Sequence, residues 1–188
     1  MARKLSREAR DKMVTAAMEV IGELGVDGFT VDEVARRSGV AKTTIYRHFE
    51  SGPALAVHAL NGMLEKFPSI DTGTLRGDLE TFGDHVRPQF NDPATRTVIA
   101  GVLAMSANER EFGEIHRQII DERKAPLIRA FQRAIARGEL DPETDLDLAH
   151  DMLEGTFVFR RILLDQIITE ADSLTIIGMV LKAIGAED

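Results

Sequence analysis

Apolar residues recur every three or four positions along most of the chain, and strand-like alternation of apolar and polar residues is nearly absent. That spacing places apolar side chains on one face of an α-helix, so the chain is expected to be all-α. The expected helices span about residues 6–24, 30–38, 41–48, 53–67, 75–87, one beginning at 92, 109–137, 146–164 and 170–184.

Residues 30–55 predict a helix-turn-helix, in which a Ser-Gly-Val turn separates two short amphipathic helices. Thr30 is placed to cap the first helix, and Glu33 three residues later completes the pattern of a capping box. Gly39 can adopt the left-handed backbone conformation that a tight turn requires. The second helix has the length of an element that enters the major groove of DNA.

This second helix carries side chains suited to DNA. Ile45 and Phe49 are expected to pack inward. The residues left facing outward are Lys42, Thr43, Thr44, Tyr46 and Arg47. Lys and Arg contact phosphates or guanine, Thr contacts phosphate or a thymine methyl group, and Tyr contacts phosphate. The alternative interpretation is a solvated helix face that happens to carry two cations.

The net charge of −8 disfavours DNA as a partner, but the charge is unevenly distributed. Residues 1–60 contain nine Lys and Arg against eight Asp and Glu, whereas the rest of the chain contains fourteen against twenty-three. Positive charge is densest in the first twelve residues, which include Arg3 and Lys4. Phosphate attracts such an arm and repels the acidic remainder, which would orient the protein on DNA. A frayed, solubilising tail is the alternative.

Composition argues against several other functions. The chain has no Cys, hence no disulfide framework and no Cys-based metal site. Its five His show no metal-ligand spacing, and neither a Ser-His-Asp ordering nor a Gly-rich phosphate loop is found. No apolar run is long enough to span a membrane, and the start lacks the apolar core of a signal peptide. We expect a soluble, cytoplasmic protein with no cofactor and no enzymatic activity.

The segment from Met13 to Leu55 resembles the N-terminal domain of TetR-type transcriptional repressors. The matching residues are Ala16-Ala17, Glu23-Leu24-Gly25, Thr30-Val31, Val34-Ala35, Ser38-Gly39-Val40, Thr44-Ile45-Tyr46-Arg47-His48-Phe49 and Leu55. A looser resemblance to C-terminal domains of one TetR branch rests on the ARGEL at 136–140 and the later Asp-Leu-x-x-x-x-Leu-x-Gly pattern. The resemblance implies a helix-turn-helix domain in residues 1–52, joined by a fourth helix to a helical effector-binding and dimerisation domain in residues 53–188.

By this resemblance the protein is expected to be a homodimeric repressor. It would bind a palindromic operator in double-stranded DNA and be released by a small hydrophobic or aromatic effector. The residues expected to contact DNA are Thr30, Lys42, Thr43, Thr44, Tyr46, Arg47, His48, Arg3 and Lys4. The rival interpretations are a dimeric partner protein on the same fold that does not bind DNA, and an enzyme.

The last two expected helices are apolar on more than one face. A helix on the outside of a monomer buries one stripe, so a second stripe calls for a second partner. Pairing with the same helices of another copy would form a four-helix dimer interface. The residues expected in that interface are Met152, Leu153, Phe159, Arg160, Ile176, Met179 and Val180. The alternative is that both helices are central core helices of a monomer.

An effector pocket is expected among the helices that follow the DNA-binding domain. Its candidate residues are Met63, Phe67, Phe82, Phe90, Met105, Phe112, His116 and Phe157. They are mostly apolar or aromatic, which favours a hydrophobic or aromatic effector. For each of them the alternative is an ordinary place in the core, or at the surface for His116.

Two positions depart from the family pattern. Gly52 stands where TetR-type proteins usually carry a Lys that reaches phosphate, and Ala41 stands where a Ser often caps the recognition helix. A lost N-cap costs on the order of 0.5–2 kcal/mol. We hypothesise that the basic N-terminal arm replaces the missing lysine, so that deleting residues 1–10 should weaken binding and flatten its salt dependence.

Overall fold

The computed structural model describes residues 7–25, 28–63, 69–93, 95, 96, 99–101, 103 and 110–186. Within these ranges every regular element is a helix, which confirms the predicted all-α fold. The chain forms two compact units: the first unit comprises Met1–Glu65 and Thr97–Ile119, and the second unit comprises Lys66–Arg96 and Ile120–Asp188. The domain boundary after residue 52 stays a prediction. No helix in the described ranges is both long and apolar enough to cross a membrane.

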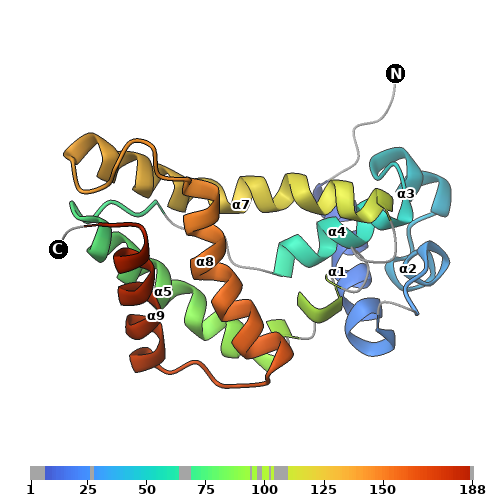
Figure 1. Cartoon of the computed structure of the whole chain (residues 1–188). Coiled ribbons are helices and arrows are strands. Elements are labelled where there is room, and N and C mark those ends of the chain that lie inside the picture. The colour runs from blue at the N-terminus through green and yellow to red at the C-terminus, as the bar shows by residue number, and fades with distance from the viewer. Residues whose placement is uncertain are drawn as a thin grey trace. The chain divides into compact units, whose positions relative to one another are not determined.

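The first unit begins with four consecutive helices that form a small bundle (Figure 1). They are α1 (Arg7–Leu24), α2 (Val31–Ser38), α3 (Lys42–His48) and α4 (Gly52–Met63). α1 packs against α2 and α4, and α2 packs against α3. The buried core of this bundle includes Met13, Ala17, Val34, Ile45 and Leu55. Because Ile45 is fully buried in it, the orientation of α3 is fixed by the same core that holds α1 and α2.

Two predicted helix caps can be compared with the structure. Thr30 caps α2, since its hydroxyl accepts from the N–H of Glu33 at 3.2 Å, and Gly39 ends that helix with a φ of 68°. The carboxylate of Glu33 instead accepts from arginines one turn further along α2, so only half of this capping box forms. A complete box forms instead at Thr169 and Asp172, with reciprocal N–H bonds of 3.0 and 3.1 Å.

In its described part, the second unit arranges several helices and one π-helical turn around its own core. They are α5 (Leu75–Asn91), the C-terminal part of α7 (Arg110–Arg137), α8 (Leu146–Val158), the π-helical turn η1 (Phe159–Leu163) and α9 (Glu170–Ala183). α5 packs against α8 and α9, and α8 also packs against α9. Fully buried side chains in this core include Leu79, Phe131, Leu153 and Phe157.

Two helices of the second unit differ from prediction at their C-terminal ends. α5 was expected to stop at Arg87 but continues through Pro88 to Asn91. Pro88 has no N–H to donate, so one helical hydrogen bond is lost, but its carbonyl still accepts. The N–H of Asp92 donates to that carbonyl at 3.0 Å. α8 was expected to run regularly to Leu164 but becomes a π-helical turn at Phe159. The N–H of Leu164 donates to the carbonyl oxygen of Phe159 at 3.1 Å and closes this turn.

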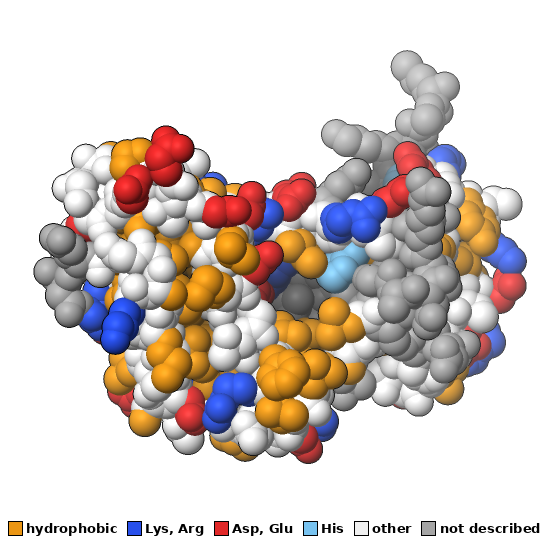
Figure 2. All heavy atoms as spheres, in the orientation of Figure 1, with side chains coloured by type: hydrophobic (Ala, Val, Ile, Leu, Met, Phe, Trp, Pro, Cys, Tyr) orange, Lys and Arg blue, Asp and Glu red, His pale blue; other side chains and the backbone are white. Residues whose placement is uncertain are grey.

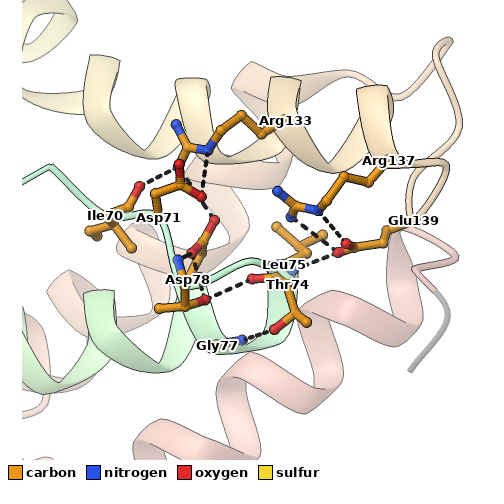
Figure 3. Close-up of polar contacts among 10 residues, drawn as sticks. Ile70, Asp71, Thr74, Leu75, Gly77, Asp78, Arg133, Arg137 and Glu139 are labelled. Atoms are coloured by element: carbon orange, nitrogen blue, oxygen red, sulfur yellow. Dashed lines mark hydrogen bonds and ion pairs between the residues drawn. The ribbon is translucent and has the colours of Figure 1, made fainter.

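The loop that precedes α5 is fastened to α7 by polar contacts (Figure 3). Asp78 is fully buried, and its Oδ1 accepts from the N–H and hydroxyl of Thr72 at 2.6 and 2.7 Å. Its Oδ2 lies 3.4 Å from Nη2 of Arg133 on α7. Close by, the carboxylate of Glu139 accepts from the N–H of Leu75 at 2.6 Å. The start of α5 is thereby held against the C-terminal turns of α7.

Candidate nucleic-acid interface

α3 presents one apolar and one polar face, as the sequence pattern predicted. Ile45 and Phe49 are 0 % and 5 % exposed and belong to the core of the first unit. Thr44 is half-buried. The exposed residues of α3 are Lys42, Thr43, Tyr46, Arg47 and His48. Thr30 is exposed at the start of α2, whereas Arg3 and Lys4 lie outside the described residues. α3 thus carries two cations, hydroxyl groups and a phenol on its solvent side.

The start of α3 is formed without a side-chain cap. Ala41 occupies the N-cap position, and its carbonyl accepts from the N–H groups of Thr44 and Ile45 at 2.8 and 3.1 Å. In the preceding turn, the hydroxyl of Ser38 accepts from the N–H of Val40 at 3.2 Å. As the alanine at position 41 implied, no side chain caps the N-terminus of α3.

Lys42 at the start of α3 forms an ion pair that the sequence pattern did not predict. Its Nζ lies 2.8 Å from each carboxylate oxygen of Asp32, which stands in the first turn of α2. The hydrogen bond to Asp32 raises the pKa of Lys42 above its ordinary value. A separation of ten residues follows no helical spacing, so only the folded turn brings the two side chains together.

A second set of ion pairs ties α2 to α1. The Glu33 carboxylate accepts from Nη2 of Arg36 at 2.5 Å and from Nε of Arg37 at 2.8 Å. These hydrogen bonds lower the pKa of Glu33 to about 2. Arg37 also donates to Glu23 on α1 at 2.8 Å. Arg36 and Arg37 of α2, like Lys42 of α3, are thus paired with carboxylates of the first unit.

The connection from α3 to α4 explains how glycine fits at position 52. Ser51 caps α4, since its hydroxyl accepts from the N–H of Ala54 at 3.2 Å. A Cβ placed on Gly52 would lie 3.2 Å from Cγ2 of Val31, a close contact with α2. α4 is further joined to α1 by a hydrogen bond from Arg10 to the ring of His58.

Comparison with known proteins decides the family. Residues 14–58 match the family model for bacterial regulatory proteins of the tetR family, and residues 69–180 match the tetracyclin repressor-like C-terminal domain. The chain belongs to the TetR family of transcription regulators. It is therefore a helix-turn-helix, DNA-binding regulator, as the resemblance of residues 13–55 implied.

Individual relatives of this TetR-family chain cover most of its length. The DNA-binding transcriptional repressor TetR of Mycobacteroides abscessus is 30% identical over 150 residues, 79% of either chain. The HTH-type transcriptional regulator AqdR of Rhodococcus erythropolis is 29% identical over 147 residues, 78% of this chain and 70% of that one. A crystal structure of a TetR family transcription regulator, 25% identical, superposes with a TM-score of 0.73 over 95% of this chain and 99% of that one.

The residues predicted for the effector pocket of this TetR-family regulator fall in different parts of the chain. Phe82, Phe90 and Phe157 are at most 5 % exposed in the core of the second unit, where the last two rings lie 6.0 Å apart. His116 lies on α7 within the first unit and is half-buried, and this burial lowers its pKa. The remaining side chains lie outside the described part of the structure: Met63, Phe67, Met105 and Phe112.

The residues predicted for the dimer interface form a buried and an exposed group. The buried ones belong to the core of the second unit and are Leu153, Ile176 and Val180. The exposed ones are Met152, Phe159 and Met179, at 37 %, 53 % and 68 % exposure. Arg160 is half-buried and pairs with Asp172 at 3.2 Å. Figure 2 shows hydrophobic side chains gathered over the face that α8 and α9 turn to the viewer.

Proposed function

We propose that this TetR-family regulator is a homodimeric repressor that binds a palindromic operator and is released by a small hydrophobic or aromatic effector. The observation that carries the proposal is the exposed polar face of α3, whose apolar side is fixed in the core through Ile45 and Phe49. The similar protein of Mycobacteroides abscessus is named a repressor, which supports repression as the mode of action.

In the proposed complex α3 enters the major groove. Its first residue, Lys42, is expected to read base edges, because the N-terminal residues of a recognition helix contact them. Arg47 in the last turn and Thr30 at the start of α2 are assigned to phosphates, together with the arm residues Arg3 and Lys4. Thr43, Thr44, Tyr46 and His48 complete the proposed contact set.

The proposed dimer uses the face of α8, η1 and α9. Met152, Phe159 and Met179 are exposed there, and Ile167, missing from the predicted set, is 59 % exposed in the segment before α9. Large exposed apolar side chains that gather on one face mark an interaction surface. A two-fold axis through it would present two copies of α3 to successive turns of DNA, and this is why a palindrome is expected. The buried Leu153, Ile176 and Val180 would support that surface from below.

The effector site is proposed for the second unit, next to the buried rings of Phe90 and Phe157. An apolar, aromatic lining favours a hydrophobic or aromatic ligand. Release from DNA requires only a difference in ligand affinity between two arrangements of the dimer. The arrangement that does not fit the operator must bind the ligand more tightly than the arrangement that fits it.

Selection of bound sequences from random duplex DNA with the purified protein tests this proposal. Wild type should enrich a palindromic consensus, and Lys42→Ala combined with Arg47→Ala should not. Arg129→Ala, which removes an exposed charge from the second unit, is the matched control and should enrich the wild-type consensus. No enrichment by wild type would favour the non-DNA-binding partner protein instead.

Oligomeric state is measured separately by light scattering. Wild type should have the mass of two chains, and Phe159→Glu with Met179→Glu should have the mass of one. A monomeric wild type at the concentrations used for DNA binding would contradict the dimer. A thermal-shift screen with hydrophobic and aromatic compounds then addresses the effector, because a ligand of the native state raises its stability.

A further inference from the structure

The carboxylate of Asp32 in α2 pairs with the side chain of Lys42 in α3. Asp32 belongs to the first turn of α2, two residues after the cap Thr30, and its partner Lys42 is the first residue of α3. Both carboxylate oxygens lie 2.8 Å from Nζ of Lys42. The two side chains are 73 % and 46 % exposed, so another anion can reach this ammonium from solvent.

The same two helix starts are the parts of a helix-turn-helix that approach DNA. A helix N-terminus favours anions, the recognition helix contacts bases through its N-terminal residues, and the first helix crosses the phosphate backbone. Asp32 therefore offers Lys42, within the protein, the kind of oxygen that a phosphate would offer it. Non-specific binding to DNA is almost entirely an interaction of cations with phosphates. Asp32 competes with those phosphates for the ammonium group of Lys42.

We propose that Asp32 is a specificity-determining residue, which holds Lys42 away from phosphates and releases it only where operator bases bind it better. The proposal rests on the proposed function, in which Lys42 contacts bases. In a non-specific complex Lys42 stays paired with Asp32, and the negative charge of Asp32 repels the backbone. In the operator complex a purine acceptor replaces the carboxylate, so the cost of breaking the ion pair is offset only at the correct base.

The competing explanation is a surface ion pair that only stabilises the turn. Such a pair would affect unfolding and leave the discrimination between operator and random DNA unchanged. The chain offers a matched control in Glu8 and Lys12 of α1, which are also 2.8 Å apart and 74 % and 57 % exposed. Neutralising Glu8 changes the net charge of the first unit by the same amount as neutralising Asp32.

The experiment compares Asp32→Asn, Glu8→Gln, Lys42→Met and the double variant Asp32→Asn/Lys42→Met. Fluorescence anisotropy gives the affinity of each for the selected operator and for a scrambled duplex over a range of salt concentrations. Circular dichroism and thermal unfolding verify that each variant is folded. We expect Asp32→Asn to raise affinity for the scrambled duplex about two- to fivefold, the range set by an exposed ion pair. Its salt dependence should steepen by about 0.9 on a log–log plot, the value of one additional phosphate contact.

Affinity for the operator should change less, so that the ratio of specific to non-specific binding falls in Asp32→Asn and stays at the wild-type value in Glu8→Gln. In the Lys42→Met background, Asp32→Asn should have no further effect on the scrambled duplex. An equal gain with or without Lys42 would overturn the proposal, because Asp32 would then act by general repulsion. Equal gains for Asp32→Asn and Glu8→Gln, or for operator and scrambled DNA, would overturn it as well.

The wild-type measurement separates this proposal from the proposed function. If wild type binds its operator and Asp32→Asn discriminates between operator and scrambled DNA as well as wild type does, only the role of Asp32 is contradicted. Absence of binding to any duplex by wild type and by Asp32→Asn contradicts both.

Discussion

The side-chain amide of Asn91 bonds to both backbone polar groups of Ile168. Its Nδ2 donates to the carbonyl oxygen of Ile168 at 2.8 Å, and its Oδ1 accepts from the N–H of Ile168 at 3.0 Å. Ile168 is 1 % exposed and lies just before the capping box of α9. One side chain at the end of α5 thus satisfies the buried backbone of a segment 77 residues away in sequence.

Replacing Asn91 should therefore destabilise the second unit. Asn91→Ala leaves a buried N–H and a buried carbonyl without partners, and the free energy of unfolding should fall by about 1–3 kcal/mol. Urea unfolding followed by circular dichroism measures the change. Gln166→Ala, an exposed site in the same segment, is the control and should stay within about 0.5 kcal/mol of wild type. Equal losses for the two variants would show that the amide of Asn91 is not the cause.

Close packing of α5 on α9 yields a second stability prediction. A Cβ on Gly83 would lie 2.5 Å from Oγ of Ser173 and 3.1 Å from Cδ1 of Ile177, and Ser173 is buried. Gly83→Ala should lower the free energy of unfolding by about 1–3 kcal/mol through overpacking. Adding Ser173→Ala removes the clashing hydroxyl and should recover part of the loss.

The control for this prediction is the same substitution in an open place. Gly22 lies within α1, and a Cβ there would have nothing within 4 Å. Gly22→Ala should stabilise the protein by about 0.5–1 kcal/mol, because alanine is the better helix former. A Gly83→Ala variant as stable as Gly22→Ala would refute the overpacking argument.

The sequence was sufficient for the features that depend on local spacing. The cap at Thr30, the turn at Gly39 and the inward-facing Ile45 all follow from periodicity and cap chemistry over a few residues. It did not predict contacts between residues that no helical spacing brings together. Asp32 with Lys42 and Asn91 with Ile168 are such pairs, and no local pattern marks them.

The sequence pattern also did not predict which apolar residues of a helix face solvent. Ile176 and Met179 both widen the apolar stripe of α9, yet the first is 8 % exposed and the second 68 %. Periodicity assigns residues to faces of one helix but does not say how much of each face its neighbours cover. The packing of α5 and α8 on α9 decides that, and it moves the proposed dimer surface toward Met179 and Phe159.

The buried His150 of α8 should make stability depend on pH. Burial by itself lowers its pKa, but contacts with Glu154 at 2.8 Å and Asp151 at 3.2 Å outweigh burial, and the pKa of His150 is raised. The folded protein then holds this proton more tightly than the unfolded chain. The resulting stabilisation is complete below the unfolded pKa of about 6.5 and is lost as the pH rises through the folded pKa.

The measurement is urea unfolding at a series of pH values from about 6 to 8, the range in which histidine titrates. The free energy of unfolding should fall with rising pH in wild type and fall less in His150→Gln. Glu154→Gln removes the largest of the contacts that raise the pKa of His150, so the slope contributed by His150 should become smaller. Identical pH profiles for wild type and His150→Gln would rule out this residue as the source.

The test of a DNA-binding arm requires a shorter deletion than the deletion of residues 1–10 that the sequence suggested. Residues from Arg7 onward belong to α1, and Arg10 donates to His58 on α4, so deleting residues 1–10 would also disturb the bundle. Deleting residues 1–6 removes Arg3 and Lys4 and leaves the described helix in place. Operator affinity should fall, and its log–log salt slope should flatten by about 0.9 for each phosphate that the arm neutralises in the full-length protein.

Adding Gly52→Lys to the shortened protein is the complementary test, because it supplies the cation that the family usually carries there. Part of the salt slope should return, provided that Val31 yields to the new Cβ, and thermal unfolding checks this condition. An unchanged slope after deletion of residues 1–6 would eliminate the arm as a phosphate contact.

The two cations of α3 should contribute differently to recognition. Lys42 at the start of the helix is assigned to base edges and Arg47 in its last turn to phosphate. Lys42→Ala should relax the consensus at one position in each half-site, where a good base contact contributes about 1–3 kcal/mol of discrimination. Arg47→Ala should weaken binding to all sequences alike and flatten the salt slope by about 0.9. Sequence selection with both variants, followed by titrations of single-base operator variants, separates these effects. An unaltered consensus for Lys42→Ala would reassign this side chain to the backbone, since a residue that contacts only phosphates carries no direct sequence information.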